Sequence, residues 1–202
     1  HDPGEGAMRY IQGRWQDNNL AYMAAVLEQH ADEDGVHLLV DGVNAFAARL
    51  ALIELASTSI DVQYYLFHSD LTGKMLAIAL LNAADNGVRV RLLIDDIDLS
   101  GRDYVLRMMD MHPNVEIRIF NPFSRLFSRT LQLLSRFGFM TRRMHNKSLT
   151  IDSLMTIVGG RNIGDEYFSA NPLVEFGDLD ALVVGPVVNE VSASFDEYWN
   201  NK

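Results

Sequence analysis

The sequence contains no cysteine. This absence excludes a disulfide framework and a thiolate metal site, and it suits a reducing compartment. No stretch reaches the ~18 consecutive apolar residues that a membrane-spanning helix needs. Basic residues are also scarce, because 17 Lys and Arg stand against 27 Asp and Glu and give a net charge of −10. Since nucleic-acid-binding proteins are usually basic, this charge argues against nucleic acid as a partner.

The chain is long enough for one domain of ordinary size. It has 202 residues, and the 48% that are hydrophobic supply a sizeable core. It opens on His1 rather than Met, so we expect a processed or engineered fragment. We interpret residues 1–35 as an N-terminal segment with a helix at 19–30, and residues 36–202 as the domain.

From Val36 onward, short apolar runs alternate with apolar residues at helical spacing. Strands are predicted at 36–40, 59–67, 88–94, 115–120, 147–151, 155–158 and 179–184. Helical stripes cover 43–53, 74–84, 102–111 and 188–198. This alternation predicts an α/β fold with a mixed, mostly parallel sheet and helices on both faces.

The residues that carry chemistry lie in the run from His145 to Asn162. His145 and Lys147 alternate along a predicted strand, so both side chains should point to one face. Lys147 and the Asn162 amide can bind the nonbridging oxygens of a phosphodiester, and preorganised donors of this kind often supply the largest catalytic effect. Neutral His145 can attack phosphorus and form a phosphohistidine, which splits one hard step into two. The spacing therefore predicts a site that attacks phosphodiesters.

This set is only half of such a site, because a second histidine must protonate the leaving alcohol and then activate the acceptor. None of the other five histidines has a Lys two residues later: His1, His30, His37, His68 and His112. A single His or Lys near a strand is usually a surface or packing residue, so the joint spacing is what indicates function. Asp152 belongs to the run but sits at a strand turn, where we expect it to hold the turn rather than touch substrate.

The spacing of His145, Lys147, Asp152, Gly159 and Asn162 matches the signature of the phospholipase D superfamily, known as the HKD motif. Gly160 stands where that family usually has Ser, so one hydroxyl donor is missing. Further stretches resemble bacterial cardiolipin synthases, closest to the C-type group: Gln63-Tyr64-Tyr65 and residues 89–96, 143–147, 162–168 and 194–199.

The resemblance implies transfer of a phosphatidyl group to an alcohol on another phospholipid, without metal or other cofactor. In that family two motif-bearing lobes share one cleft, and this chain resembles the first lobe. It also implies a bacterial protein that is cytoplasmic or peripheral to the inner membrane, with phospholipid as substrate and a second lobe or a homodimer partner.

The stretch 176–186 resembles the family's strand after the motif, whose first Asp accepts a hydrogen bond from the catalytic histidine. We therefore expect Asp178 to fix the tautomer of His145. Asp180 and Glu175 compete for that role, and all three carboxylates would otherwise be solvated. The candidate catalytic residues are His145, Lys147, Asp152, Asn162 and Asp178. The candidate substrate-binding residues are Lys147, Asn162, Gly160 and Arg143.

Residues 121–151 contain no acidic side chain, although the whole chain is acidic. If 123–137 is helical, Phe123, Phe127 and Leu131 share one face, while Arg125 and Arg129 lie opposite. A basic amphipathic helix can bind an anionic membrane surface. The alternatives are a surface helix with solvated arginines and a face that covers the cleft or meets the partner lobe.

Taken together, the sequence predicts a phosphatidyltransferase, most simply a cardiolipin synthase, that works through a phosphohistidine. One alternative is a phospholipase D or nuclease-type phosphodiesterase that completes its site as a homodimer. Another is a lobe that is inactive alone and binds lipid headgroups.

Overall fold

A computed structural model describes residues 32–96, 103–122, 143–171 and 173–201. Two predicted helices, at 19–30 and 123–137, lie outside these residues. None of the helices in the described ranges is both long and apolar enough to cross a membrane.

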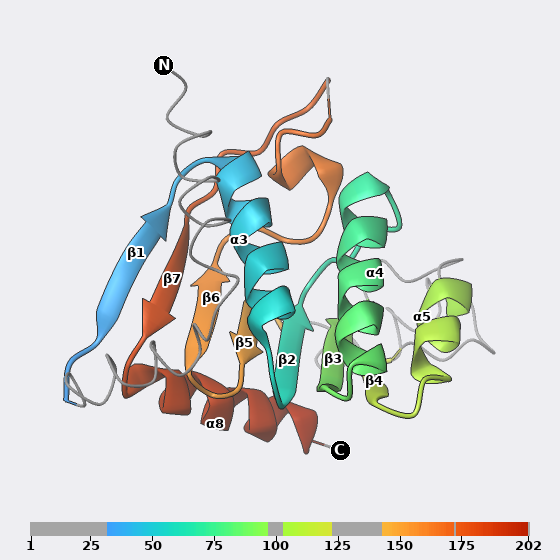
Figure 1. Cartoon of the computed structure of the whole chain (residues 1–202). Coiled ribbons are helices and arrows are strands. Elements are labelled where there is room, and N and C mark those ends of the chain that lie inside the picture. The colour runs from blue at the N-terminus through green and yellow to red at the C-terminus, as the bar shows by residue number, and fades with distance from the viewer. Residues whose placement is uncertain (1–31, 97–102, 123–142, 172, 202) are drawn as a thin grey trace.

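The described residues form one seven-stranded sheet (Figure 1), whose spatial order is β1-β7-β6-β5-β2-β3-β4. The strands are β1 (Gly35–Leu39), β2 (Ser59–Tyr64), β3 (Arg89–Asp95), β4 (Val115–Phe120), β5 (Ser148–Ile151), β6 (Met155–Gly159) and β7 (Asp180–Val184). All seven correspond to predicted strands, and the prediction of a mixed α/β sheet is confirmed.

The prediction that the sheet is mostly parallel is wrong. Only β2-β3 and β3-β4 are parallel. The pairs β1-β7, β2-β5, β5-β6 and β6-β7 are antiparallel. Parallel neighbours need a long crossover, which α4 and α5 provide, whereas a tight turn such as the one at 152–154 can join only antiparallel strands.

Helices cover both faces of the sheet, as predicted. The helices α3 (Gly42–Leu55), α4 (Leu71–Asp85) and α5 (Asp103–Asp110) lie on one face, seen in front of the sheet in Figure 1. The helix α8 (Val187–Trp199) lies on the other, where Phe195 and Trp199 pack against Leu93. Neighbouring Leu92 packs into the α3–α4 core instead, because successive strand residues face opposite sides.

β2 ends three residues earlier than predicted. Ile60, Val62 and Tyr64 lie in the core on one side of the strand, as expected. Beyond Tyr64 the chain leaves the sheet, because both polar groups of the Leu66 backbone bind the segment after β6: its N–H donates to the Asn162 side chain and its carbonyl accepts from the Ile163 N–H.

The sheet brings the two parts of the motif to one edge. β2 and β3 end there as parallel strands, and the antiparallel β5 begins there, since Ser148 pairs with Gln63. β6 ends at the same edge, since Val158 pairs with Ser148. Residues 143–147 and 159–162 are therefore neighbours in space.

The opposite edge is held by Asp152, in the turn between β5 and β6. Its carboxylate accepts hydrogen bonds of 2.7 to 2.9 Å from the backbone N–H groups of Ser57, Thr58 and Ser59 and from the hydroxyls of Ser57 and Thr58. This is the turn-holding role expected of Asp152. It fastens the hairpin to the start of β2, far along the strand from His145.

We predict that Asp152→Ala lowers the free energy of unfolding by about 2–3 kcal/mol, because five donors lose a charged acceptor. Burial alone would raise the pKa of Asp152, but hydrogen bonds from Thr58, Ser57 and Ser59 outweigh it and hold the pKa below 3.8. A depressed folded-state pKa gives stability that is complete above the unfolded value, about 3.9, and is lost as pH falls through the folded value. Urea unfolding should therefore show wild type and variant converging in acid.

The control is Glu54→Ala, which removes an exposed carboxylate from α3 and should change stability by less than about 0.5 kcal/mol. Equal stability of Asp152→Ala and wild type at neutral pH would contradict the role given to Asp152.

Candidate active site

His145 and Lys147 meet at the edge where β5 begins, and their side chains share one side. The prediction that they alternate along a strand is wrong, because both precede β5 (Ser148–Ile151). Lys147 Nζ lies 3.3 Å from His145 Nδ1 and donates to the His145 carbonyl at 2.7 Å. The ring of Tyr65 contacts both side chains. Its centroid lies 4.8 Å from the centroid of the His145 ring and 5.6 Å from the Lys147 ammonium. Since His145 is exposed, its imidazole can meet a substrate.

The contact with Lys147 bears on the tautomer of His145. An ammonium can only donate, so a hydrogen bond across this distance requires Nδ1 to be the acceptor and the ring proton to be on Nε2. Attack through Nε2 needs the other tautomer, with the proton on Nδ1 and an acceptor facing it. The hydrogen bond with Lys147 and attack through Nε2 therefore require different tautomers of His145.

Asp178 lies beside this pair but does not bind His145 directly. Its negative charge acts on Lys147, and its Oδ1 would lie 2.4 Å from a Cβ built on Gly160. In the described part of the chain, no hydrogen bond joins Asp178 to His145, so its orienting role stays a prediction. The two competitors are engaged elsewhere: Asp180 binds Arg49, and Glu175 accepts from the Ser169 hydroxyl.

Lys147 is buried, with 8% of the residue's surface exposed. Burial lowers its pKa below the ordinary value of 10.5, and the nearby Asp178 carboxylate partly offsets the effect. Burial also strengthens the attraction between the ammonium and a phosphoryl oxygen, since screening by water is reduced. Lys147 is therefore placed to bind an anion.

Asn162 is buried and held at both ends of its amide. Its Oδ1 accepts from the Leu66 N–H at 3.0 Å, and its Nδ2 donates to the Tyr167 hydroxyl at 3.1 Å. One amide hydrogen is thus committed to Tyr167, and the second is left for a phosphoryl oxygen. The roles of Tyr65 and Tyr167 were missed from sequence, because an aromatic residue shows no sign of its partner until the chain is folded.

A buried ionic network fixes the loop that carries Asn162. The Asp180 carboxylate accepts from Arg49 at 2.8 Å, from the Arg161 N–H at 3.2 Å and from the Arg161 guanidinium at 3.4 Å. Arg161 also donates to the carbonyls of Leu39, Val40 and Tyr167. The residue just before Asn162 is therefore tied to β7 and to the end of β1.

Two glycines let β7 approach this loop. A Cβ on Gly159 would come within 2.6 Å of the Asp180 Cα and of the Leu179 carbonyl. A Cβ on Gly160, where the family usually has Ser, would meet only the carboxyl end of Asp178. Gly160 thus makes room for the Asp178 carboxylate beside Lys147.

Arg143 holds the chain just before His145. Its guanidinium binds the Asp95 carboxylate at 3.0 Å and the Asn121 carbonyl at 3.2 Å, while the other Asp95 oxygen accepts from the Met144 N–H. Asp95 is buried at the end of β3, so it anchors this segment to the sheet. The structure gives Arg143 a positioning role, and its binding of substrate stays a prediction.

One group of side chains in the described ranges could ligate a cation. The ligand atoms of His68, Asp70 and Glu166 lie within 4.8 Å of one another. Asp70 is already used as the N-cap of α4 and accepts from the Asp165 N–H. The chemistry of His145 and Lys147 does not involve this group.

The fold and the site together define a phospholipase D-type domain. Residues 50–199 match the family described as "Cardiolipin synthase, PLD-like domain", and the chain belongs to this family. It is 49% identical over 171 residues to Cardiolipin synthase C of Escherichia coli (strain K12), covering 85% of this chain and 36% of that protein. It is 31% identical to the major cardiolipin synthase ClsA of Bacillus subtilis (strain 168), covering 92% of this chain and 38% of that protein. The chain thus spans little more than a third of these relatives.

A solved structure shares the fold. The phospholipase D family member Nuc from Salmonella typhimurium superposes with a TM-score of 0.57 at 20% identity, and the match covers 83% of this chain and 95% of that one. At this identity the likeness shows the architecture alone.

We predict that the two glycines differ in their tolerance of a side chain. Gly159→Ala should cost about 1–3 kcal/mol of stability, because its Cβ meets backbone atoms of β7 and the sheet must shift. Gly160→Ala should cost less, because the Asp178 side chain can rotate away. Thermal unfolding of both variants tests the order, and an equal or larger loss in Gly160→Ala would contradict it.

We also predict that Asp178→Asn lowers the pKa of Lys147 further, because it removes the charge that opposes the effect of burial. NMR titration of the Lys147 side chain measures this without turnover. The control Glu175→Gln should leave the midpoint unchanged. A midpoint in Asp178→Asn that equals or exceeds that of wild type would contradict the placement of Asp178.

Proposed function

We propose that this chain is a catalytic lobe of a bacterial cardiolipin synthase, which transfers a phosphatidyl group from one phospholipid to an alcohol on another. The observation that carries the proposal is the exposed His145 imidazole beside the ammonium of the buried residue Lys147, on the sheet edge that also holds Asn162. The family match and the 49% identity to Cardiolipin synthase C support the substrate class.

The proposed reaction has two steps, which are formation of the phosphohistidine and its attack by the acceptor alcohol. Lys147 and Asn162 bind the nonbridging oxygens, and His145 Nε2 forms a bond to phosphorus while the bond to the leaving alcohol breaks. A second histidine gives that alcohol its proton. The same histidine then takes the proton of the incoming hydroxyl, whose oxygen displaces His145 from the phosphohistidine. We propose no metal or other cofactor, because Lys147 supplies the positive charge.

The second histidine comes from another lobe or from a second copy of this chain. His145 is exposed at its edge, and the motif occurs once in the 202 residues. The longer relatives favour a second lobe. The match to 95% of the Nuc chain favours a homodimeric phosphodiesterase as the alternative, since it shows that this fold can form a chain of one lobe.

We propose that the domain of residues 36–202, preceded by the segment 1–35, works on phospholipid in a bacterium, either peripheral to the inner membrane or in the cytoplasm. A basic helix at 123–137 that binds anionic lipid stays a prediction, because it lies outside the described residues.

The test is turnover on mixed phosphatidylglycerol and phosphatidylethanolamine vesicles, with the mass in solution measured in parallel. We expect cardiolipin to form when two lobes are present, and His145→Ala to lower the rate by about 10³ or more, because the nucleophile is lost. His112→Ala is the matched control, since His112 binds Asp85 beside α5 and not the site.

Cardiolipin formation that survives His145→Ala would overturn the mechanism. A dimer that hydrolyses phosphodiesters without forming cardiolipin would favour the alternative enzyme. A monomer without turnover would favour a lobe that needs a separate partner.

A further inference from the structure

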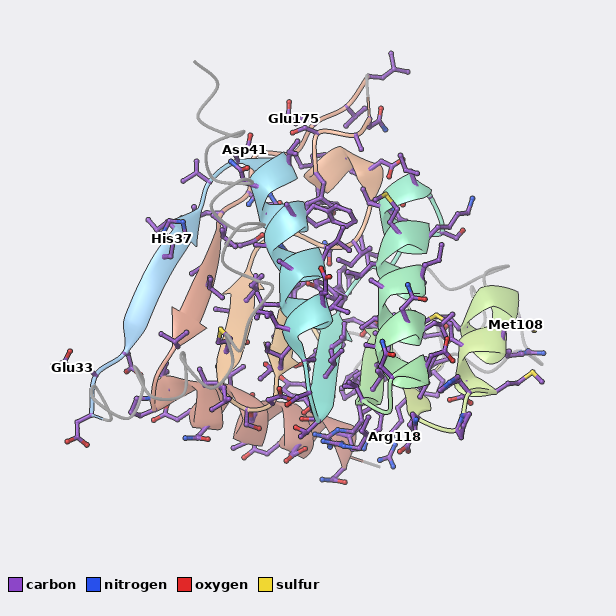
Figure 2. The ribbon with its side chains drawn as sticks, viewed as in Figure 1. Glu33, His37, Asp41, Met108, Arg118 and Glu175 are labelled. Carbon is purple, nitrogen blue, oxygen red and sulfur yellow. The ribbon has the colours of Figure 1, made fainter. Side chains whose placement is uncertain are left out.

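An exposed apolar loop borders the candidate site. We call residues 173–179 the rim loop. Its four large apolar side chains face solvent: Leu173 is 90% exposed, Val174 45%, Phe176 46% and Leu179 51%. In Figure 1 the loop extends beyond the start of α3, and Figure 2 shows its Glu175 near Asp41 at that end of the molecule.

The rim loop is bonded to the site, so its apolar side chains are held in the open. The Phe176 N–H donates to the Glu166 carbonyl at 2.8 Å. The Phe176 ring packs on Tyr167 with centroids 5.1 Å apart, and Tyr167 binds Asn162. At the tip, Asn171 Oδ1 accepts from the Leu173 and Val174 N–H groups.

A lipid substrate must enter the site without exposing its acyl chains to water. Under the proposed function, the phosphodiester must reach His145 while its acyl chains remain out of water. The cost of exposing an acyl chain grows with every CH₂ group. Apolar side chains beside the site can cover the acyl chains and keep them out of water.

We propose that the rim loop inserts its apolar side chains into the acyl region of a bilayer and so holds the site at the lipid surface. This inference rests on the proposed function for its choice of occupant. Four side chains on one short loop offer far less than the roughly 800 Å² that each partner buries in a stable protein interface. Insertion into a bilayer needs no complementary protein surface, because each apolar side chain that leaves water contributes its own free energy of transfer.

The charge of the rim loop distinguishes insertion of apolar side chains from electrostatic binding of arginines to anionic lipid. Its charged residues are Glu175 and Asp178, both acidic, so it does not attract anionic headgroups. Binding through the loop should therefore occur on neutral phosphatidylcholine vesicles and persist in 1 M salt, where the Debye length falls to about 3 Å.

The experiment measures binding to phosphatidylcholine vesicles in 1 M NaCl for wild type, Leu173→Asp and Met111→Asp. Met111 is the matched control, because it is 77% exposed and follows α5 at the opposite edge of the sheet. We expect Leu173→Asp to weaken vesicle binding by about tenfold or more, because a buried Leu side chain is lost. Met111→Asp should bind like wild type.

A second measurement does not depend on the stability of the Asp variants. Leu173→Trp should gain a blue-shifted emission, relative to wild type, that is quenched by lipids brominated on the acyl chain. Met111→Trp should show neither change. Equal vesicle binding by the two Asp variants would overturn the proposal, and so would the absence of quenching in Leu173→Trp. It would also be overturned if Leu173→Asp changed the mass in solution but left vesicle binding unchanged.

Vesicle binding and cardiolipin formation are measured separately, so failure of the proposed function can be told apart from failure of the bilayer contact. His145→Ala should bind vesicles like wild type, since binding needs no turnover. Vesicle binding that depends on Leu173, in a protein that forms no cardiolipin even when two lobes are present, would leave the bilayer contact standing and reject the synthase.

Discussion

The site depends on one buried carboxylate held between two guanidinium groups. Asp180 binds Arg49 and Arg161, and the side chains of all three are almost completely buried. Burial alone would lower the pKa of Arg49, but attraction to Tyr64 and Asp180 raises it above its ordinary value. Such a group is stable only while its partners remain, because loss of one leaves an uncompensated charge in the core. The network ties β7, the end of β1 and the loop 159–162 together, and so fixes Asn162.

Two opposing electrostatic effects act on the pKa of Lys147, a candidate catalytic residue. Burial lowers the pKa of Lys147, and the charge of Asp178 offsets part of this decrease. Gly160 makes this possible, because any larger side chain would displace the Asp178 carboxylate. The departure from the family's usual Ser is thus the loss of a hydroxyl and the removal of a side chain that would meet Asp178. His145, in contrast, stays exposed.

Much of the fold could be predicted from local pattern. Alternation and apolar runs located all seven strands, and helical stripes located four helices, because those periods reflect which side of each element is buried. The order and direction of the strands could not be read in this way. Pairing of β5 with β2, and of β1 with β7, joins segments far apart in the chain, so the mostly parallel arrangement expected from alternation did not hold.

For the site, the sequence by itself determined the chemistry: His145, Lys147 and Asn162 at a spacing suited to phosphodiesters, and Asp152 at a turn. Only the tertiary structure decided their surroundings. It placed Asp178 beside Lys147 instead of in a hydrogen bond with His145, tied Arg143 to Asp95, and brought Tyr65 and Tyr167 to the reacting groups. The physical reason is that residue type and spacing fix which groups can react, whereas burial, partners and pKa depend on atoms that meet only when distant strands pair.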